Sequence, residues 1–210
     1  MKINKRFITI ALFVGWVGLA FSVNAHAGVE TYQIDKDHSF ANWRIRHVVA
    51  YVSGSFYDVK GNIVIDPENL SATRVNASIN LFSLSTGNTQ RDVHLLSGDF
   101  FDALKFKEMH FASTGVKSAS KDSGILLGQL TLRGVTRPVE LPFKVLGFGA
   151  DPWGGYRAGF MANTTLKRSD FDIAWGLELP NGGPVGDEVQ VELLIEGVKL
   201  GPDGNPVQVK

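Results

Sequence analysis

The sequence predicts an all-β protein, a single antiparallel barrel or sandwich of about eight strands. Apolar and polar residues alternate with period two in many segments, which is typical of half-buried strands. Turns rich in Gly, Pro and Asn separate these segments. The sequence contains no cysteine, so the fold must depend on its hydrophobic core rather than on disulfides.

The strand pattern is clear near residue 43, where Trp43 and Ile45 alternate with polar neighbours. Gly134 and Pro138 bracket a break between two apolar segments and predict a hairpin there. The chain shows no linker between domains. The predicted strands are, in order, 41–47, 52–65, 75–81, 107–116, 126–132, 139–145, 154–166 and 189–195.

One stretch departs from the β pattern. Val93, Leu96, Phe100 and Leu104 fall at positions i, i+3, i+7 and i+11, which predicts an amphipathic helical stripe. We expect Gly98 to split this stretch into two short pieces. A helical segment near 91–104 is long enough to lie across one end of a barrel as a plug or lid.

The first 27 residues have the features of a secretory signal peptide. Three basic residues precede an uncharged run at 7–21, and Ala25 and Ala27 form a small-x-small cleavage pattern. An uncleaved anchor is the alternative, but it would need roughly 20 apolar residues. We therefore expect residues 1–27 to be removed and 28–210 to form one domain in the periplasm.

The charge balance argues against a nucleic-acid partner. Removing the three basic residues of the leader reduces the 21 Lys and Arg to 18, against 21 Asp and Glu. The net charge near −3 offers no basic surface for a polyanion. The absence of cysteine also excludes thiol nucleophiles and thiolate metal sites.

Motifs for hydrolysis are absent. The sequence has neither the Gly-x-Ser-x-Gly of a nucleophile elbow nor the His-Glu-x-x-His of a zinc hydrolase. The histidines beyond the leader are far apart in the chain, so we expect no metal site. The sequence therefore gives no positive sign of an enzyme.

The segment 86–102 gathers charged residues beside a Phe-Phe pair, and three interpretations stay open. They are a structural polar cluster, a contact with a ligand head group, and a catalytic site. Aspartate caps helices, and arginine can bind a carboxylate with paired hydrogen bonds, so the structural interpretation is favoured. We expect Arg91 to pair with one or more of the aspartates. The residues concerned are Arg91, Asp92, His94, Asp99 and Asp102.

The interior of an eight-stranded barrel can be filled by side chains or can hold one slender ligand. Gly54, Gly128 and Gly159 lie on predicted strands and remove volume from the wall, although bends and bulges also explain strand glycines. Most of the many aromatic residues are expected simply to be buried.

Five blocks of the sequence carry a family resemblance. In order, they are "YQIDKDHSFANWRIRH", "GSFYDVKGNIVIDPEN", "ASINLFSLSTGNTQRDVHLLSGDFFD", "LTLRGVTRPVELPF" and "TTLKRSDFDIAW". Together they resemble the YceI-like family of exported, lipocalin-like, polyisoprenoid-binding proteins, over about residues 32–199. The sequence departs from the family pattern at Lys107, where proline is usual, and at Asp172, where glycine is usual.

The resemblance implies an eight-stranded antiparallel lipocalin-like barrel around a long apolar tunnel. The tunnel would hold the tail of a polyprenyl compound or an isoprenoid quinone and would be closed partly by residues 91–106. Arg91, His94 and Asp99 would be candidate head-group or lid contacts. The expected ligand contacts are Trp43, Ile45, Phe56, Ile79, Leu81, Leu96, Phe100, Phe101, Phe111, Leu130, Leu132, Leu141, Phe143 and Phe160.

The sequence is therefore interpreted as a periplasmic, non-enzymatic carrier or store for an isoprenoid-type lipid. No cofactor is required, and the bound molecule would be the lipid or quinone itself. Transient contact with a membrane or membrane protein, and a homodimer, stay open. The alternatives are an enzyme that acts on such a lipid through Arg91, His94 and Asp99, and a filled structural barrel without a ligand.

Overall fold

The computed structural model describes residues 28–209, so the predicted signal peptide at 1–27 lies outside the described residues. The strands are β1 (Glu30–Ile34), β2 (Phe40–His47), β3 (Ala50–Phe56), β4 (Val59–Ile65), β5 (Arg74–Asn80), β6 (Leu84–Ser85), β7 (Glu108–Lys117), β8 (Ser123–Leu132), β9 (Val135–Ala150), β10 (Tyr156–Lys167) and β11 (Val185–Leu200). The helices are α1 (Thr89–Leu96) and the short 3-10 turns η1 (Lys36–His38), η2 (Leu70–Ala72), η3 (Leu81–Ser83), η4 (Arg168–Phe171) and η5 (Pro180–Gly182). None of the helices in this part of the chain is long and apolar enough to cross a membrane.

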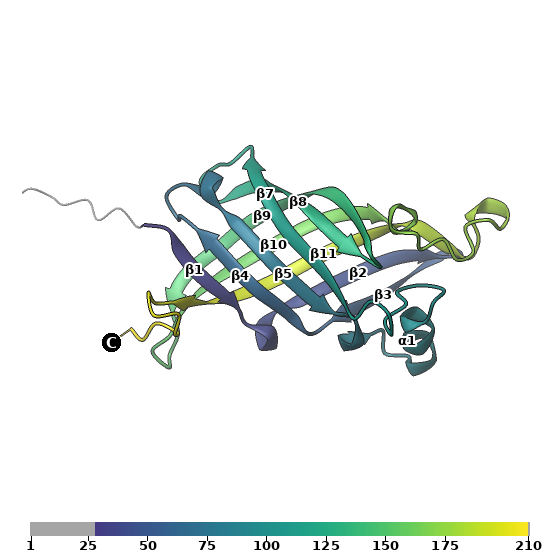
Figure 1. Cartoon of the computed structure of the whole chain (residues 1–210), viewed down its shortest axis with the longest axis horizontal. Coiled ribbons are helices and arrows are strands. Elements are labelled where there is room, and N and C mark those ends of the chain that lie inside the picture. Colours follow the sequence, from purple (N-terminus) through teal and green to yellow (C-terminus); the bar gives the residue numbers. More distant parts are fainter. Residues whose placement is uncertain (1–27, 210) are drawn as a thin grey trace, which may run out of the picture.

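The strands form a closed antiparallel barrel (Figure 1). The ring runs β1-β4-β5-β7-β8-β9-β10-β11 and closes because β1 pairs with both β4 and β11. The other three strands lengthen this wall: β2 follows β1 after η1, β3 precedes β4, and β6 follows β5 after η3. The predicted eight-stranded, lipocalin-like barrel is thus confirmed.

Most of the predicted strands are present, with differences at their ends. The segment predicted as one strand at 52–65 is interrupted between β3 and β4, and β1 was not predicted. The predicted hairpin joins Leu132 to Val135, and its two loop residues, Arg133 and Gly134, have φ of 51° and 78°. Positive φ at both positions is typical of a type I′ turn. Pro138 does not bracket the break but lies within β9 opposite Gln129.

The helical segment differs from the predicted stripe. The helix begins after Asn88, whose side chain accepts a hydrogen bond from the amide of Arg91 (3.0 Å), and it ends at Leu96. Irregular turns follow, and Leu104 is 86% exposed. Val93 is also exposed, so the stripe of Val93, Leu96, Phe100 and Leu104 is not one buried face. The predicted stripe was wrong because the helix ends at Leu96, so Phe100 and Leu104 do not continue its face.

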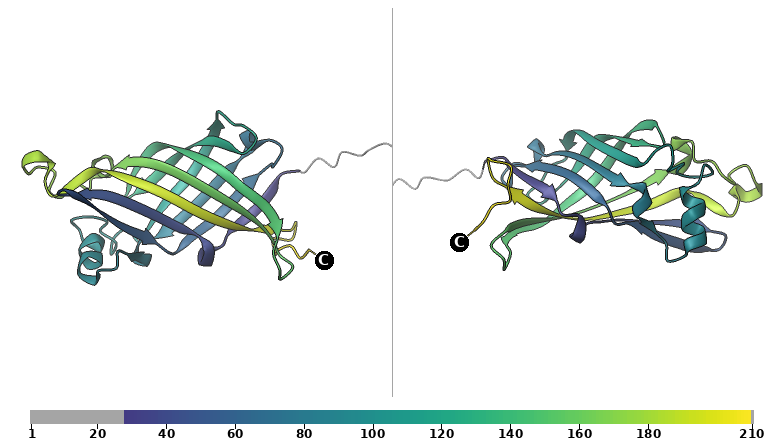
Figure 2. Two further views of the ribbon diagram at one scale, coloured as in Figure 1. Left: turned by 180° about the vertical axis from the view of Figure 1, so that it is seen from behind. Right: turned by 60° about the horizontal axis from the view of Figure 1, so that its bottom comes forward.

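The helical segment lies at the end of the barrel opposite the described chain ends (Figure 2). There it follows the short β6, which pairs with β3 through only Ser85 and Leu84. Arg133 at the β8–β9 turn donates to the carbonyl of Gly98 (2.7 Å), which fastens the segment to the far wall. The segment therefore covers the barrel at the end where β6 stops.

The two ends of the barrel interior are packed differently. At the end near the described termini, the rings of Tyr32, Phe148 and Phe160 meet with centroid separations of 5.9 to 6.4 Å. At the end near α1, a separate cluster contains Phe100, Leu132, Phe171 and Ile173. Asp172 lies between two members of that cluster in left-handed geometry with φ 58°, which aspartate tolerates better than most residues. The candidate ligand-binding cavity lies in the barrel interior between these two clusters.

Candidate ligand-binding tunnel

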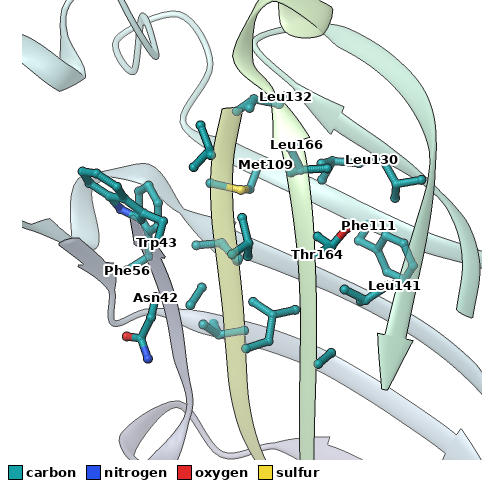
Figure 3. Close-up of a pocket in the computed structure, with 18 of the residues that line it drawn as sticks. Asn42, Trp43, Phe56, Met109, Phe111, Leu130, Leu132, Leu141, Thr164 and Leu166 are labelled. Atoms are coloured by element: carbon teal, nitrogen blue, oxygen red, sulfur yellow. The ribbon is translucent and has the colours of Figure 1, made fainter. Parts of the chain in front are cut away.

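The barrel encloses a cavity of about 790 Å³, within the range of small-molecule sites. Inward-facing side chains from all eight ring strands and from β2 and β3 approach it, because alternate residues of a strand point to the same side. Figure 3 shows Trp43 and Phe56 on one side and Leu130, Phe111 and Leu141 on the other. The interior is therefore not filled by side chains alone.

Most of the residues predicted to contact a ligand line this cavity, and their contact with a ligand stays a prediction. Leu81 and Leu96 do not line it. Leu81 is fully buried in η3, where β5 has already broken off, and Leu96 faces the neighbouring core rather than the cavity. The predicted residues in the lining are Trp43, Ile45, Phe56, Ile79, Phe100, Phe101, Phe111, Leu130, Leu132, Leu141, Phe143 and Phe160.

The side of α1 that faces the cavity is largely polar. Arg91, His94 and Leu95 line the cavity together with Asn88 and Gln90. Positions i, i+3 and i+4 share one face of a helix, which explains why Arg91, His94 and Leu95 occur together. The helix therefore places Arg91 and His94 at this end of the tunnel, which we call the mouth, and leaves Val93 exposed on the outside.

Arg91 does not pair with an aspartate in the predicted way. Its guanidinium donates from Nε to Oγ1 of Thr86 (2.8 Å) and from Nη2 to the carbonyl of Thr86 (2.9 Å). Asp92 accepts from the hydroxyl of the same threonine (2.5 Å) and from its amide (2.9 Å). Arg91 and Asp92 thus meet through Thr86. The predicted pairing of Arg91 with an aspartate was wrong because the hydroxyl of Thr86 lies between the two side chains and bonds to both.

Asp102 is also apart from Arg91. It adopts a positive φ of 49°, and its carbonyl accepts from the amides of Lys105 and Phe106. Its role in the described structure is to turn the chain after α1. Asp99, likewise, does not line the cavity.

His94 sits in an aromatic and acidic surrounding at the mouth. Its Nε2 lies 2.9 Å from Oδ2 of Asp99. Its ring meets Phe100 and Trp175 edge-on, with centroids 5.1 and 5.3 Å away. Asp99 therefore fixes the imidazole from outside the cavity, while the ring itself faces the cavity.

Phe100 and Phe101 both reach the cavity but pack into different neighbours. Phe100 is buried and contacts the cluster with Leu132 and Phe171. Phe101 is partly buried, and its ring packs edge-on against Phe56, with 5.6 Å between the centroids. The pair thus links the helical segment to two parts of the barrel.

Arg168 was not predicted as a site residue, yet it lies beside the mouth and lines the cavity. It is 5% exposed and donates to the carbonyls of Gly186, Ile173, Trp175 and Val185 at 2.8 to 3.1 Å. Burial lowers the pKa of this guanidinium, and the charges of Asp187 and Glu178 counteract that effect. Arg168 therefore holds the loop that follows β10 against β11.

Other lining residues were missed, although period two could have found several. Met109 precedes Phe111 by two residues, and Thr164 and Leu166 continue the inward face that begins at Phe160. Trp175 lies in a loop, where no period applies. Loop residues become part of the lining only through tertiary folding.

A second polar cluster lies outside the tunnel. Asp35, His38 and Glu196 place ligand-type atoms within 4.8 Å of one another. The guanidinium of Arg157 already binds the carboxylates of Asp35 (2.6 Å) and Glu196 and also donates to Asp151 (2.8 Å). A side-chain cation thus occupies the centre of this acidic group, which joins η1, β10 and β11.

A closed antiparallel barrel of eight strands with an apolar interior cavity places the protein in the lipocalin-like class of barrels. Comparison of the sequence with family models gives the narrower answer. The YceI-like domain matches residues 32–197, and the chain belongs to that family.

Known relatives agree with this assignment. A UPF0312 protein of Enterobacter sp. (strain 638) is 41% identical over 199 residues, covering 93% of this chain and 98% of the relative. The crystal structure of Burkholderia cenocepacia BcnA superposes with a TM-score of 0.69 at 23% identity, covering 78% of this chain and 98% of BcnA. A polyisoprenoid binding domain from Saccharophagus degradans superposes with a TM-score of 0.61 at 17% identity, covering 80% of this chain and 97% of that domain. The two structures share the fold.

Proposed function

We propose that the protein binds the tail of an isoprenoid-type lipid, a polyprenyl compound or an isoprenoid quinone, in its barrel. The observation that carries this proposal is the cavity of about 790 Å³, whose lining is predominantly aliphatic and aromatic. The similar fold of a domain described as polyisoprenoid binding supports it. The protein would carry or store this lipid in the periplasm without changing it chemically.

Burial of the tail supplies the binding free energy. Each methylene-sized group removed from water contributes about 0.8 kcal/mol, so one prenyl unit offers roughly 3 to 4 kcal/mol before the cost of immobilising it. Several units exceed what any single polar contact provides. The length and width of the tunnel would then select the ligand.

The mouth is the proposed site of exchange with a membrane. Val49, in the β2–β3 turn, is 97% exposed, and Val48 beside it donates its amide to the carbonyl of Pro184 (2.7 Å). Trp175 and Leu179, in the same loop as Pro184, are also exposed. These apolar side chains lie next to lining residues, so they would contact a bilayer surface where an insoluble tail enters or leaves.

The test is recovery of the bound molecule. The chain is produced with its leader in a bacterial host, purified from the periplasm, and studied by native mass spectrometry followed by organic extraction. The proposal expects a mass increase and an intact isoprenoid lipid in the extract. A chemically converted lipid would instead favour an enzyme that uses Arg91 and His94. Failure to bind any added polyprenyl lipid would overturn the proposal.

A further inference from the structure

The indole Nε1 of Trp43 is a buried hydrogen-bond donor on the wall of the tunnel. Within residues 28–209 it has no hydrogen-bond partner. Tryptophan carries only this one donor and no acceptor. A donor enclosed among apolar groups without an acceptor is unfavourable, and buried indole N–H groups usually find a partner. A ligand inside the tunnel can provide the missing acceptor.

The position of the indole is built into the wall. Trp43 on β2 pairs with Gly54 on β3, and its six-membered ring lies over that glycine. A Cβ at position 54 would lie 2.5 Å from Cζ2 of Trp43 and 2.8 Å from Cγ2 of Thr86. Any larger residue at 54 would therefore displace the indole. The absence of a side chain at Gly54 leaves room for both the indole of Trp43 and the methyl group of Thr86.

The indole lies in the half of the tunnel beneath the helical segment. Phe56, which lies near Trp43 in Figure 3, packs against Phe101 of that segment. Thr86, which packs over Gly54 with the indole, is the residue that Arg91 binds. One other lining atom in the described chain has no partner, Oγ1 of Thr73. Thr73 lies just before β5, where the start of β5 pairs with the end of β4 and that end pairs with the start of β1. The two atoms thus mark opposite ends of the tunnel.

The charges near Trp43 favour a neutral acceptor over an anion. The positive Arg91 and the negative Asp92 both bind the hydroxyl of Thr86. Their charges offset each other at this point, and two nitrogens of Arg91 are already engaged by Thr86. Among the described residues, the charged side chains that line the cavity are Arg91, Lys167 and Arg168, and both arginines already donate to Thr86 or to backbone carbonyls. A carbonyl oxygen needs only one donor, which Trp43 supplies.

We infer that the ligand carries an uncharged carbonyl-type oxygen, as in an ester or a quinone ring, which accepts a hydrogen bond from Nε1 of Trp43. The inference rests on the proposed function and adds an orientation to it. The head group lies at Trp43 beneath α1, and the tail extends toward the aromatic cluster of Tyr32, Phe148 and Phe160.

A matched pair of ligands tests this inference. Geranylgeranyl acetate carries a carbonyl, and the tetraprenyl hydrocarbon of the same tail carries no oxygen. Affinities are measured by displacement of a fluorescent fatty-acid probe from the wild type, from Trp43→Phe and from the control Trp153→Phe, whose indole is exposed in the β9–β10 loop. Trp43→Phe should weaken acetate binding about two- to tenfold, the range for one hydrogen bond. The affinity of this variant for the hydrocarbon should stay close to that of the wild type. Trp153→Phe should change neither.

A second measurement does not depend on the folding of a variant. The indole ¹H–¹⁵N resonance of Trp43 in the wild type should move downfield when the acetate binds and should move less with the hydrocarbon. If both ligands bind the wild type but the preference survives in Trp43→Phe, or if Thr73→Val removes it instead, the inference is overturned while the proposed function stands. If neither ligand binds the wild type, both are overturned.

Discussion

The ring of Phe101 packs edge-on against the ring of Phe56, with 5.6 Å between the centroids, and so joins the segment after α1 to the wall of the barrel. Its neighbour Phe100 is directed into the cluster of Leu132, Phe171 and Ile173. Two adjacent aromatic residues thus hold the same segment at two different places. Replacing Phe100 and replacing Phe101 should therefore have different effects on stability and on ligand release.

Replacing Phe100 by Ala should lower the free energy of unfolding by about 3 to 5 kcal/mol, because a buried aromatic ring leaves a cavity. Phe101→Ala should cost less stability and should speed ligand release, because the partly buried ring contacts both the tunnel and the wall. Chemical denaturation and ligand off-rates measure the two effects. Val93→Ala, at an exposed position of α1, is the control. Equal release rates for all variants would remove the segment from ligand retention.

The length of the tunnel can be reduced at Ala162. This residue is buried, lines the cavity and lies on β10 between Phe143 and Leu193. Ala162→Phe should obstruct the passage, lowering the affinity for long polyprenyl chains at least about tenfold while farnesyl compounds are retained. Overpacking itself should cost roughly 1 to 3 kcal/mol of stability. Asn163→Phe, on the outer face, is the control, and an equal loss for short and long chains would contradict a linear tunnel.

The exposed apolar side chains at the mouth, Val49, Trp175 and Leu179, form a rim whose role can be tested by the rate of lipid transfer from a membrane. Val49→Asp should slow the transfer of a polyprenyl lipid from donor vesicles, because a carboxylate at the rim opposes insertion into the apolar part of a bilayer. Trp153→Asp is the control: it alters another highly exposed apolar residue, in the β9–β10 loop beside Val209. Slower transfer in both variants, or in neither, would mean that the mouth does not dock on the membrane.

Arg168 should contribute more to stability than an exposed arginine. Arg168→Met would leave the carbonyls of Gly186, Ile173, Trp175 and Val185 without this donor, at a cost on the order of 3 kcal/mol. Arg137, which is exposed and donates only to the carbonyl of Asp170, should cost less than about 1 kcal/mol when changed to Met. Thermal and chemical unfolding measure both. Equal costs would mean that the loop does not depend on Arg168.

The strands were largely predictable because a half-buried strand repeats its pattern every two residues. Trp43 and Ile45 therefore announce both β2 and its inward face. The ends of strands were less predictable. The break between β3 and β4 arises because β3 pairs with β2 and β6 whereas β4 pairs with β1 and β5, and the short β1 pairs with the distant β4 and β11. Pairing of that kind leaves little trace in a local window.

The helical segment shows a different limit. The sequence pattern assumed that an amphipathic helix directs its apolar stripe inward, but the face of α1 at the tunnel mouth carries Arg91 and His94. A mouth must remain compatible with water, so its inner face is polar. The buried Arg168 could not be predicted either, since its partners are backbone carbonyls and any sequence supplies those.

The carboxylate of Asp35, at the end opposite the mouth, should stabilise the protein against acid. Burial would raise the pKa of Asp35, but hydrogen bonds from Arg157 and His38 outweigh this and hold the pKa at about 2, below the ordinary 3.8. A carboxyl whose pKa is depressed by folding stabilises the protein above its unfolded pKa. This contribution, about 2 kcal/mol, is lost as the pH falls from about 4 through about 2.

Asp35→Asn should therefore lower the free energy of unfolding at pH 7, and the difference from the wild type should shrink between pH 4 and pH 2. Asp37→Asn, whose carboxylate pairs with the exposed Lys36, should change stability by less than about 1 kcal/mol at any pH. Urea denaturation across this pH range gives both curves. A difference between Asp35→Asn and the wild type that persists at pH 2 would mean that the carboxylate of Asp35 does not support the junction of η1, β10 and β11 through its charge.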